Sequence, residues 1–175
     1  MTSTRFDTAS QARQIDVLLH VVTDVELKAV LAAASSVSRR KQPIGFAYGR
    51  RSCIDLGQIG GASVFVIQTE MGSVSSGSSL PSILAAIEEF SPSSIIMVGI
   101  AFGAMESKTP IGTVLVSSHV QLYEPQRLST GGERTPRGER VATSPKLISL
   151  FRIVGAVLDS PPPTKYGLVL SGEKL

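Results

Sequence analysis

Four apolar runs in this sequence end in acidic, glycine or serine residues, the residue types from which a chain can bind or attack a small molecule. The run IDVLLHVV is followed by TDVE, residues 23–26. The carboxylate of Glu26 can act as a general base or orient a water molecule. It can equally be an exposed residue in the first turn of a helix, where the helix dipole favours a negative charge. The other three run ends are TEMGS (69–73), GIAFG (99–103) and SGEKL (171–175).

The elements around these run ends predict an α/β protein. Apolar runs of strand length alternate with amphipathic segments, in the order β-α-β-β-α-β-β-α-β, which predicts a mixed, mostly parallel sheet with helices on its faces. Ligands of such sheets bind beyond the carboxyl ends of the strands, so we expect the four run ends to share one site. Expected strands are 15–22, 54–56, 62–68, 94–98, 113–122 and 167–170; expected helices are 25–34, 80–90 and 144–158.

Composition narrows the class of protein. The 175 residues are 42% hydrophobic with a mean hydropathy of +0.21, which excludes a disordered chain and allows a sizeable core. A net charge of +3 is too small to argue for nucleic acid. No apolar run approaches the roughly 20 residues of a membrane span. The one cysteine, Cys53, excludes an internal disulfide and fits a reducing compartment, so we expect a cytoplasmic protein with Cys53 in its core.

Metal and cofactor chemistry are not expected. The sequence has no Cys-x-x-Cys or His-x-x-x-His pattern, and its two histidines are far apart. His20 stands inside an apolar run, which is typical of a core or sheet-face histidine. His119 follows two serines in an expected strand and stays a candidate for a role in a site.

Three polar segments interrupt the pattern. Residues 1–14 are expected to be a flexible leader without the apolar core of a signal peptide. Residues 35–51 carry five arginines and lysines, and residues 124–144 are expected to form a long loop because glycine and proline recur in them.

Four motifs, in this order, resemble the nucleoside phosphorylase/nucleosidase superfamily, with its methylthioadenosine/S-adenosylhomocysteine nucleosidase branch closest. They are VTDVELKAV, TEMGSV, IIMVGIAFGAM with IGTVLVSSHVQLYEP, and YGLVLSGEKL. The resemblance runs from about residue 15 to residue 175. It implies a three-layer α/β/α sandwich around a mixed sheet. It also implies cleavage of an N-glycosidic bond through a ribosyl cation-like transition state, while an acid protonates the departing purine.

The resemblance assigns roles to particular residues. Glu26 matches the acidic residue that orients the attacking water. Gly72 matches a glycine at which backbone approaches the ligand, although a plain strand-to-helix turn also explains it. Phe102 stands where the family usually has glycine, so either stacking on the base or a packing role is open. The residues that match binding positions are Gly72, Ile100, Ala101, Phe102, Gly103, Ser171, Gly172 and Leu175.

The same resemblance favours water over phosphate as the nucleophile. Phosphorylases of this superfamily hold phosphate with an arginine and a serine at places where this chain has Met97 and Ile100. An apolar pair cannot offset the desolvation of a phosphate dianion, and the carboxylates of Asp24 and Glu26 repel it. An arginine from the basic segment 39–51 is the counterargument, since a comparable loop reaches phosphate in some phosphorylases.

Family domains continue beyond the SG turn with a Glu that binds ribose and an Asp that protonates the base. We therefore expect residues 15–175 to be the N-terminal two-thirds of such a domain, without that catalytic Asp. The predicted function is hydrolysis of a purine nucleoside or nucleotide. A non-catalytic nucleotide-binding module, a phosphorylase and an unrelated Rossmann-like domain remain alternatives. The resemblance also implies a homo-oligomer, most simply a dimer. The small net charge and the lack of a long apolar run predict no nucleic-acid or membrane partner.

Overall fold

A computed structural model describes most of the chain and divides it into two compact units, Met1–Ile100 and Ala101–Leu175. Each unit is described by itself. The described residues are 5–7, 15–38, 42–48, 51–70, 79–103, 109–122, 126–128, 134–136 and 139–171.

The first unit is built on a mixed sheet with the strand order β1-β3-β4-β5-β2-β6. Strand β2 lies between β5 and β6 and pairs with both in parallel, whereas β3, β4 and β5 are joined by antiparallel pairings. Gly60 and Gly61, with φ of 58° and 85°, form the tight turn between β4 and β5. The elements are β1 (Arg5–Asp7), β2 (Val17–Val21), α1 (Asp24–Val37), β3 (Ile44–Tyr48), β4 (Arg51–Ile59), β5 (Ala62–Gln68), α2 (Ser79–Phe90) and β6 (Ser94–Met97).

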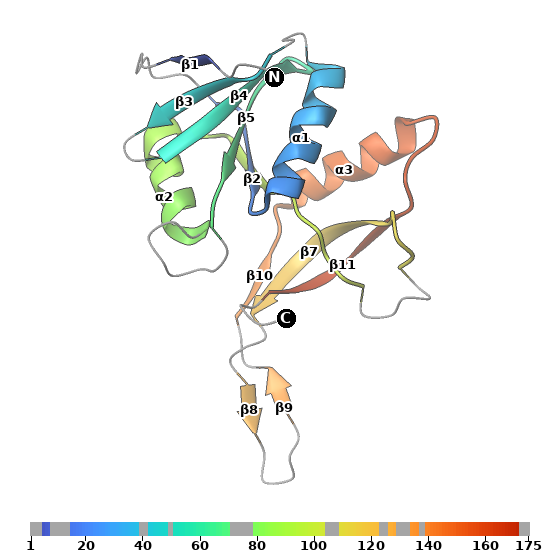
Figure 1. Ribbon diagram of the computed structural model, residues 1–175. Coiled ribbons are helices and arrows are strands. Elements are labelled where there is room, and N and C mark those ends of the chain that lie inside the picture. Colours follow the sequence, from blue (N-terminus) through green and yellow to red (C-terminus); the bar gives the residue numbers. More distant parts are fainter. Residues whose placement is uncertain are drawn as a thin grey trace. The chain divides into compact units, whose positions relative to one another are not determined.

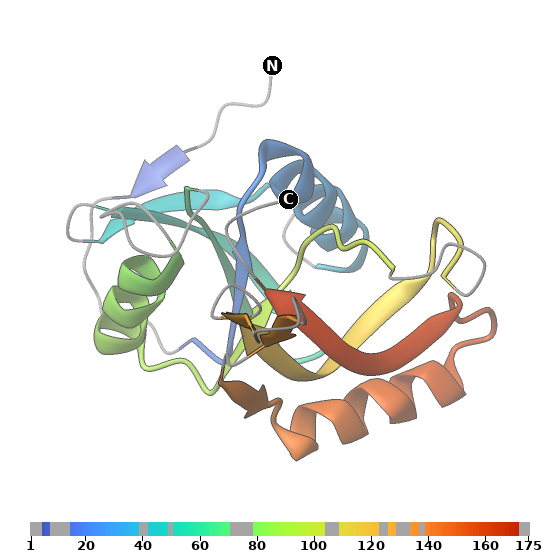
Figure 2. The same cartoon turned by 90° about the horizontal axis from the view of Figure 1, so that it is seen from below.

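Alternation along the central strands gives this sheet two apolar faces, and each face is covered by one helix (Figures 1 and 2). In β5, Phe65 and Ile67 pack with Ala86 of α2, while Val64 and Val66 pack with Val30 of α1. Strands buried on both faces require the near-continuous apolar runs seen in the sequence. The first unit is therefore a three-layer α/β/α sandwich, as predicted.

The second unit contains a sheet of order β10-β7-β11 and one long helix, α3, which runs beside β7 and β11 (Figure 2). Strand β11 pairs with β7 in parallel, and β10 pairs with β7 antiparallel. The guanidinium of Arg152 on α3 lies over the ring of Tyr166 on β11. The elements are β7 (Val114–Leu122), β8 (Gln126–Leu128), β9 (Arg134–Pro136), β10 (Arg140–Ala142), α3 (Pro145–Val157) and β11 (Thr164–Ser171).

Three polar segments contain strands that the sequence pattern does not predict. Strand β1 lies inside the expected leader and pairs in parallel with β3. The basic segment 35–51 contributes β3, and the expected loop 124–144 contains β8, β9 and β10. Strands β1, β8, β9 and β10 have three residues each, which is too short for a periodic pattern. Strand β3 does alternate, with Ile44 and Phe46 in the core of the first unit, but it lies within a basic segment. Among the described residues, no helix is long and apolar enough to span a membrane.

His20 is fully buried in β2 and begins a chain of side-chain hydrogen bonds. Its Nε2 lies 2.8 Å from the Thr69 hydroxyl, which lies 3.2 Å from the Ser79 hydroxyl at the start of α2. Its Nδ1 has no hydrogen-bond partner in the described part of the chain. Burial lowers the pKa of His20, and the nearby charge of Glu26 only partly opposes this. The imidazole is therefore neutral at pH 7 and serves as a core residue, as its place in an apolar run indicates.

We expect the protein to lose stability as the pH falls below about 6.5, because the unfolded chain protonates His20 there and the native chain does so only at lower pH. Urea denaturation between about pH 7.5 and 5.5 measures the free energy of unfolding. The same series on His20→Phe, which keeps the ring volume but cannot titrate, should show a weaker decline. Equal declines in both proteins would assign the pH dependence to other groups.

Candidate functional site

The candidate site of the first unit lies where three parallel strands end. Val21 of β2 is in register with Gln68 of β5, and His20 is in register with Met97 of β6. The pairing extends one residue further on each side, through Thr69 N–H to the Val21 carbonyl and Val98 N–H to the His20 carbonyl. The residues that directly follow these strands, Val22, Thr69 and Val98, therefore lie at one edge of the sheet.

Glu26 occupies this edge and is held by backbone groups of two segments. Thr23 caps α1, and Glu26 is its capping-box partner. One carboxylate oxygen, Oε2, accepts hydrogen bonds from Val22 N–H at 3.0 Å and Thr23 N–H at 2.8 Å. The other, Oε1, accepts one from Ile100 N–H at 2.9 Å. Glu26 therefore has the helix-start role that the sequence left open, and it also bonds to the residue segment that follows β6. Its role towards a water molecule or ligand stays a prediction.

The hydrogen bonds leave one oxygen of Glu26 available to a ligand. An ionised carboxylate accepts about four hydrogen bonds, two on each oxygen. Among the residues that the structure describes, Oε2 already has two donors, whereas Oε1 has one, Ile100 N–H. The free acceptor position is therefore on Oε1, which is the oxygen that faces the end of β6.

The same contacts keep Glu26 ionised. Burial by itself raises the pKa of the carboxyl group, but the hydrogen bonds from Thr23, Ile100 and Val22 outweigh it and lower the pKa overall. A carboxylate with a lowered pKa is a weak base. It is suited to orienting a water molecule and to stabilising positive charge rather than to removing a proton early in a reaction.

Gly99 permits this arrangement. A Cβ atom at residue 99 would lie 2.9 Å from Glu26 Oε1 and 3.6 Å from its carboxyl carbon. Any residue other than glycine at position 99 would therefore displace the Glu26 carboxylate. The sequence pattern placed Gly99 at a strand end but gave no sign of which side chain it accommodates.

Other polar groups at this edge were not singled out from the sequence. Gln68 Nε2 donates to Asp24 Oδ1 at 2.8 Å and to the Val22 carbonyl at 3.3 Å, which ties the end of β5 to the start of α1. Thr69 follows Gln68 and bonds to His20. Gln68 ends a buried strand and Thr69 opens TEMGS directly after it, and this position is the signal that could have identified them.

The predicted site residues fall into three groups. Glu26 and Ile100 are brought together in the first unit. In the second unit, Ala101 and Phe102 are exposed, a Cβ on Gly103 would overlap the Thr109 side chain, and Ser171 ends β11 beside Leu122. The remaining predictions lie outside the described residues; they are Gly72, Gly172 and Leu175.

Comparison with known protein families matches residues 18–175 to the phosphorylase superfamily. The chain belongs to this superfamily. A search of curated proteins for similar sequences finds no match. The superfamily resemblance drawn from the four sequence motifs is thereby confirmed, together with the α/β fold class.

Solved structures of this superfamily share the fold at low sequence identity. The 5'-methylthioadenosine/S-adenosylhomocysteine nucleosidase of Neisseria meningitidis in complex with methylthio-immucillin-A is 17% identical, with a TM-score of 0.66 over 91% of this chain and 65% of the other. The nucleosidase of the same name from Helicobacter pylori is 16% identical, with a TM-score of 0.67 over 93% of this chain and 66% of the other. Futalosine hydrolase of Helicobacter pylori is 16% identical, with a TM-score of 0.67 over 91% of this chain and 65% of the other. The chain thus spans about 65% of the length of these superfamily members.

Replacing Gly99 by alanine should move the Glu26 carboxylate without unfolding the first unit, because the clash falls on the end of a flexible side chain. With the Ile100 hydrogen bond weakened, the pKa of Glu26 should rise towards its ordinary value. Carbon-13 NMR titration of the Glu26 carboxyl carbon measures this directly.

Gly155→Ala is the matched control, since a Cβ there meets nothing within 4 Å. It should leave the Glu26 titration unchanged and favour helix α3, because alanine is a better helix former than glycine. An unchanged Glu26 pKa in Gly99→Ala would show that Gly99 does not govern the position of the carboxylate.

Proposed function

We propose that this chain provides the water-binding half of a nucleosidase, which hydrolyses the N-glycosidic bond of a purine nucleoside or nucleotide. The observation that carries the proposal is the single open acceptor position on Glu26 Oε1, at the carboxyl ends of β2, β5 and β6. Ligands of open α/β sheets bind at such strand ends. The superfamily membership and the nucleosidase names of the similar structures support the same reaction class.

In the proposed reaction the bond between C1' of the sugar and the base nitrogen breaks, and its electron pair leaves with the base. An acid supplies the proton that neutralises the base. Water held at Glu26 Oε1 forms the new bond to C1', and its proton passes to the carboxylate and then to solvent. The ionised Glu26 also stabilises the positive charge on the sugar in the transition state, where a fixed negative group acts most strongly.

The charges at this edge favour water over phosphate. Asp24 and Glu26 both follow β2, and Met97 and Ile100 at the end of β6 are 66% and 70% exposed apolar side chains. A phosphate dianion would meet two carboxylates and two side chains that offer it no donor. We propose on these grounds that the reaction is hydrolytic. Phosphate-dependent cleavage remains the second alternative, through an arginine of segment 39–51.

The proposal extends to substrate and cellular context. The names of the Neisseria meningitidis and Helicobacter pylori nucleosidases contain an adenine nucleoside, which supports a purine as the leaving base here. The acid that protonates the base is proposed to come from the part of the domain that those proteins have and this chain does not span.

A single cysteine supports a reducing compartment such as the cytoplasm. Homodimer formation stays a prediction from the resemblance.

A nucleoside-binding module without catalysis is the main alternative, since Met97, Ile100 and Phe102 stand where the family has polar or small residues. The two functions differ in a direct assay. Base release from methylthioadenosine, adenosine and AMP is followed by chromatography with this chain and with the longest product of its reading frame. Release of free base supports the nucleosidase. Saturable adenosine binding without release by the longest product would select the module instead.

Glu26→Gln should lower the rate of base release by about a hundredfold or more, because the amide cannot accept the full set of hydrogen bonds or hold the water through a charge. Thermal denaturation is measured in parallel, since the same change removes a negative charge from the first turn of α1 and alters the N3 residue of its capping box. Glu88→Gln on the exposed surface of α2 is the matched control and should retain full activity. Equal rates for Glu26→Gln and its parent would remove Glu26 from the reaction.

A further inference from the structure

A hollow of about 420 Å³ lies in the second unit between helix α3 and strands β7 and β10. This volume is within the range of small-molecule sites, about 300–1,000 Å³. None of its lining residues belongs to the site assigned to glycosidic cleavage. Its polar lining residues are Ser118, His119, Thr143, Ser149 and Arg152.

An irregularity in β7 brings two of these side chains into the same hollow. The parallel register pairs Ser117 with Gly167 and His119 with Leu168, so Ser118 is an extra residue that has no partner on β11. Neighbouring residues of a regular strand point to opposite faces, whereas a bulge re-aims one of them. Ser118 Oγ consequently lies 3.3 Å from His119 Nδ1, and both residues line the hollow.

The His119 ring can present a donor to a ligand. If the Ser118 hydroxyl donates to Nδ1, the neutral ring carries its proton on Nε2. No hydrogen bond occupies that nitrogen among the residues that the structure describes. The sequence left His119 open as a candidate for a role in a site, and the proposed glycosidic cleavage does not use it.

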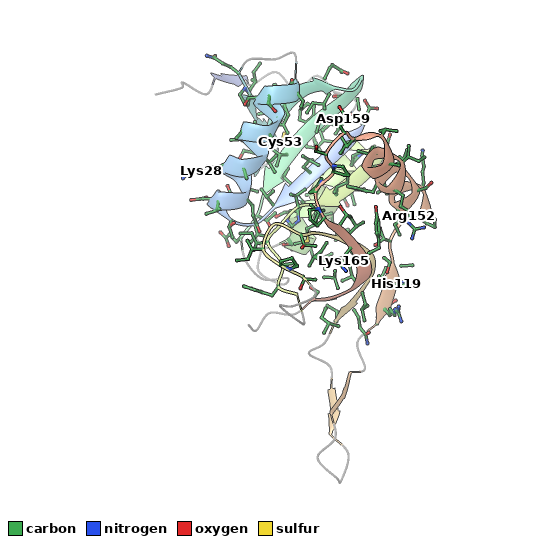
Figure 3. All side chains as sticks on the ribbon, turned by 90° about the vertical axis from the view of Figure 1, so that its right-hand side faces the viewer. Lys28, Cys53, His119, Arg152, Asp159 and Lys165 are labelled. Atoms are coloured by element: carbon green, nitrogen blue, oxygen red, sulfur yellow. The ribbon has the colours of Figure 1, made fainter. Side chains whose placement is uncertain are left out.

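Arg152 supplies a fixed positive charge. Its guanidinium carbon lies 5.1 Å from the centroid of the Tyr166 ring, a cation–π contact that restricts the side chain without neutralising it. Figure 3 shows Arg152 on α3 and His119 on β7, the two nitrogen-bearing side chains of the hollow. A guanidinium offers several N–H donors in the plane that suits phosphate or carboxylate oxygens.

The elements around the hollow carry no opposing charge. Strands β7, β10 and β11 and helix α3 contain no aspartate or glutamate within their bounds. Their charged residues are all basic, namely Arg140, Lys146, Arg152 and Lys165. Of these, Arg152 lines the hollow, so an anion that enters it meets one positive charge together with the polar groups of the serine, threonine and histidine side chains.

We propose that this hollow is a binding site for a phosphate group, either as the free ion or as a small phosphate monoester. Arg152 forms the charged contact, His119 Nε2 adds a donor, and the hydroxyls of Ser118, Thr143 and Ser149 complete a polar lining. The volume leaves room for a sugar-sized group beside the phosphate. This inference is independent of the nucleosidase reaction, since binding here uses none of its residues.

The test is an NMR titration of the chain with inorganic phosphate, ribose 5-phosphate and ribose, at ionic strength held constant with sodium chloride. Phosphate or its ester should produce saturable shifts at the amides of His119, Thr143 and Ser149, and neutral ribose should not. Arg152→Gln should weaken binding about tenfold, since a charge-assisted hydrogen bond of this kind contributes roughly that factor. Arg152→Lys should lie between the two because it keeps the charge and loses the planar donors.

Lys165→Gln is the control of matched charge. Lys165 precedes Tyr166 on β11, so strand alternation directs its side chain to the face of the sheet opposite α3. Its loss should change the affinity less than twofold. Equal affinities for Arg152→Gln and the parent, shifts that grow linearly without saturation, or the same shifts with ribose would each overturn the proposal. Binding of the ester but not the free ion, or the reverse, identifies which of the two the hollow takes.

Discussion

In the described part of the first unit, the arrangement at the carboxyl ends of β2 and β6 depends on the hydrogen bonds of the Glu26 carboxylate. This carboxylate accepts hydrogen bonds from N–H groups at the start of α1 and from Ile100 N–H, which is 74 residues further along the chain. A charge-assisted bond to backbone is stronger than a neutral one, and here it fixes the end of β6 relative to β2. One negative charge therefore holds together the segments that follow β2 and β6, and the proposed reaction uses the same charge.

This dual use constrains the mechanism. Three backbone donors lower the pKa of Glu26 and leave one acceptor position on Oε1, so the residue cannot be a strong base while it also holds the helix start. A reaction with a ribosyl cation-like transition state makes a modest demand on the base, because the sugar already carries positive charge when water attacks. Gly99 completes the arrangement by leaving space beside Oε1.

The two units differ in their electrostatics as well as in their folds. In the first, Asp24 and Glu26 make the strand exit acidic, whereas the strands and helix of the second carry only basic and neutral side chains. Superfamily membership accounts for the sheet and helix pattern but not for this contrast, since likeness at 16–17% identity shows the fold alone. This contrast is the physical reason for proposing that a neutral base is released at the strand ends of the first unit and that a phosphate group binds in the hollow of the second unit.

The sequence by itself determined the elements whose burial leaves a periodic trace. Strands β2 and β5 are apolar on both faces because helices cover both, and Thr23 with Glu26 marks the start of α1 through the capping-box spacing. Tertiary structure alone decided which groups meet. The contact of Glu26 with Ile100, the room left by Gly99 and the pairing of Ser118 with His119 all depend on strand register, and register arises from pairings between distant segments that no local pattern encodes.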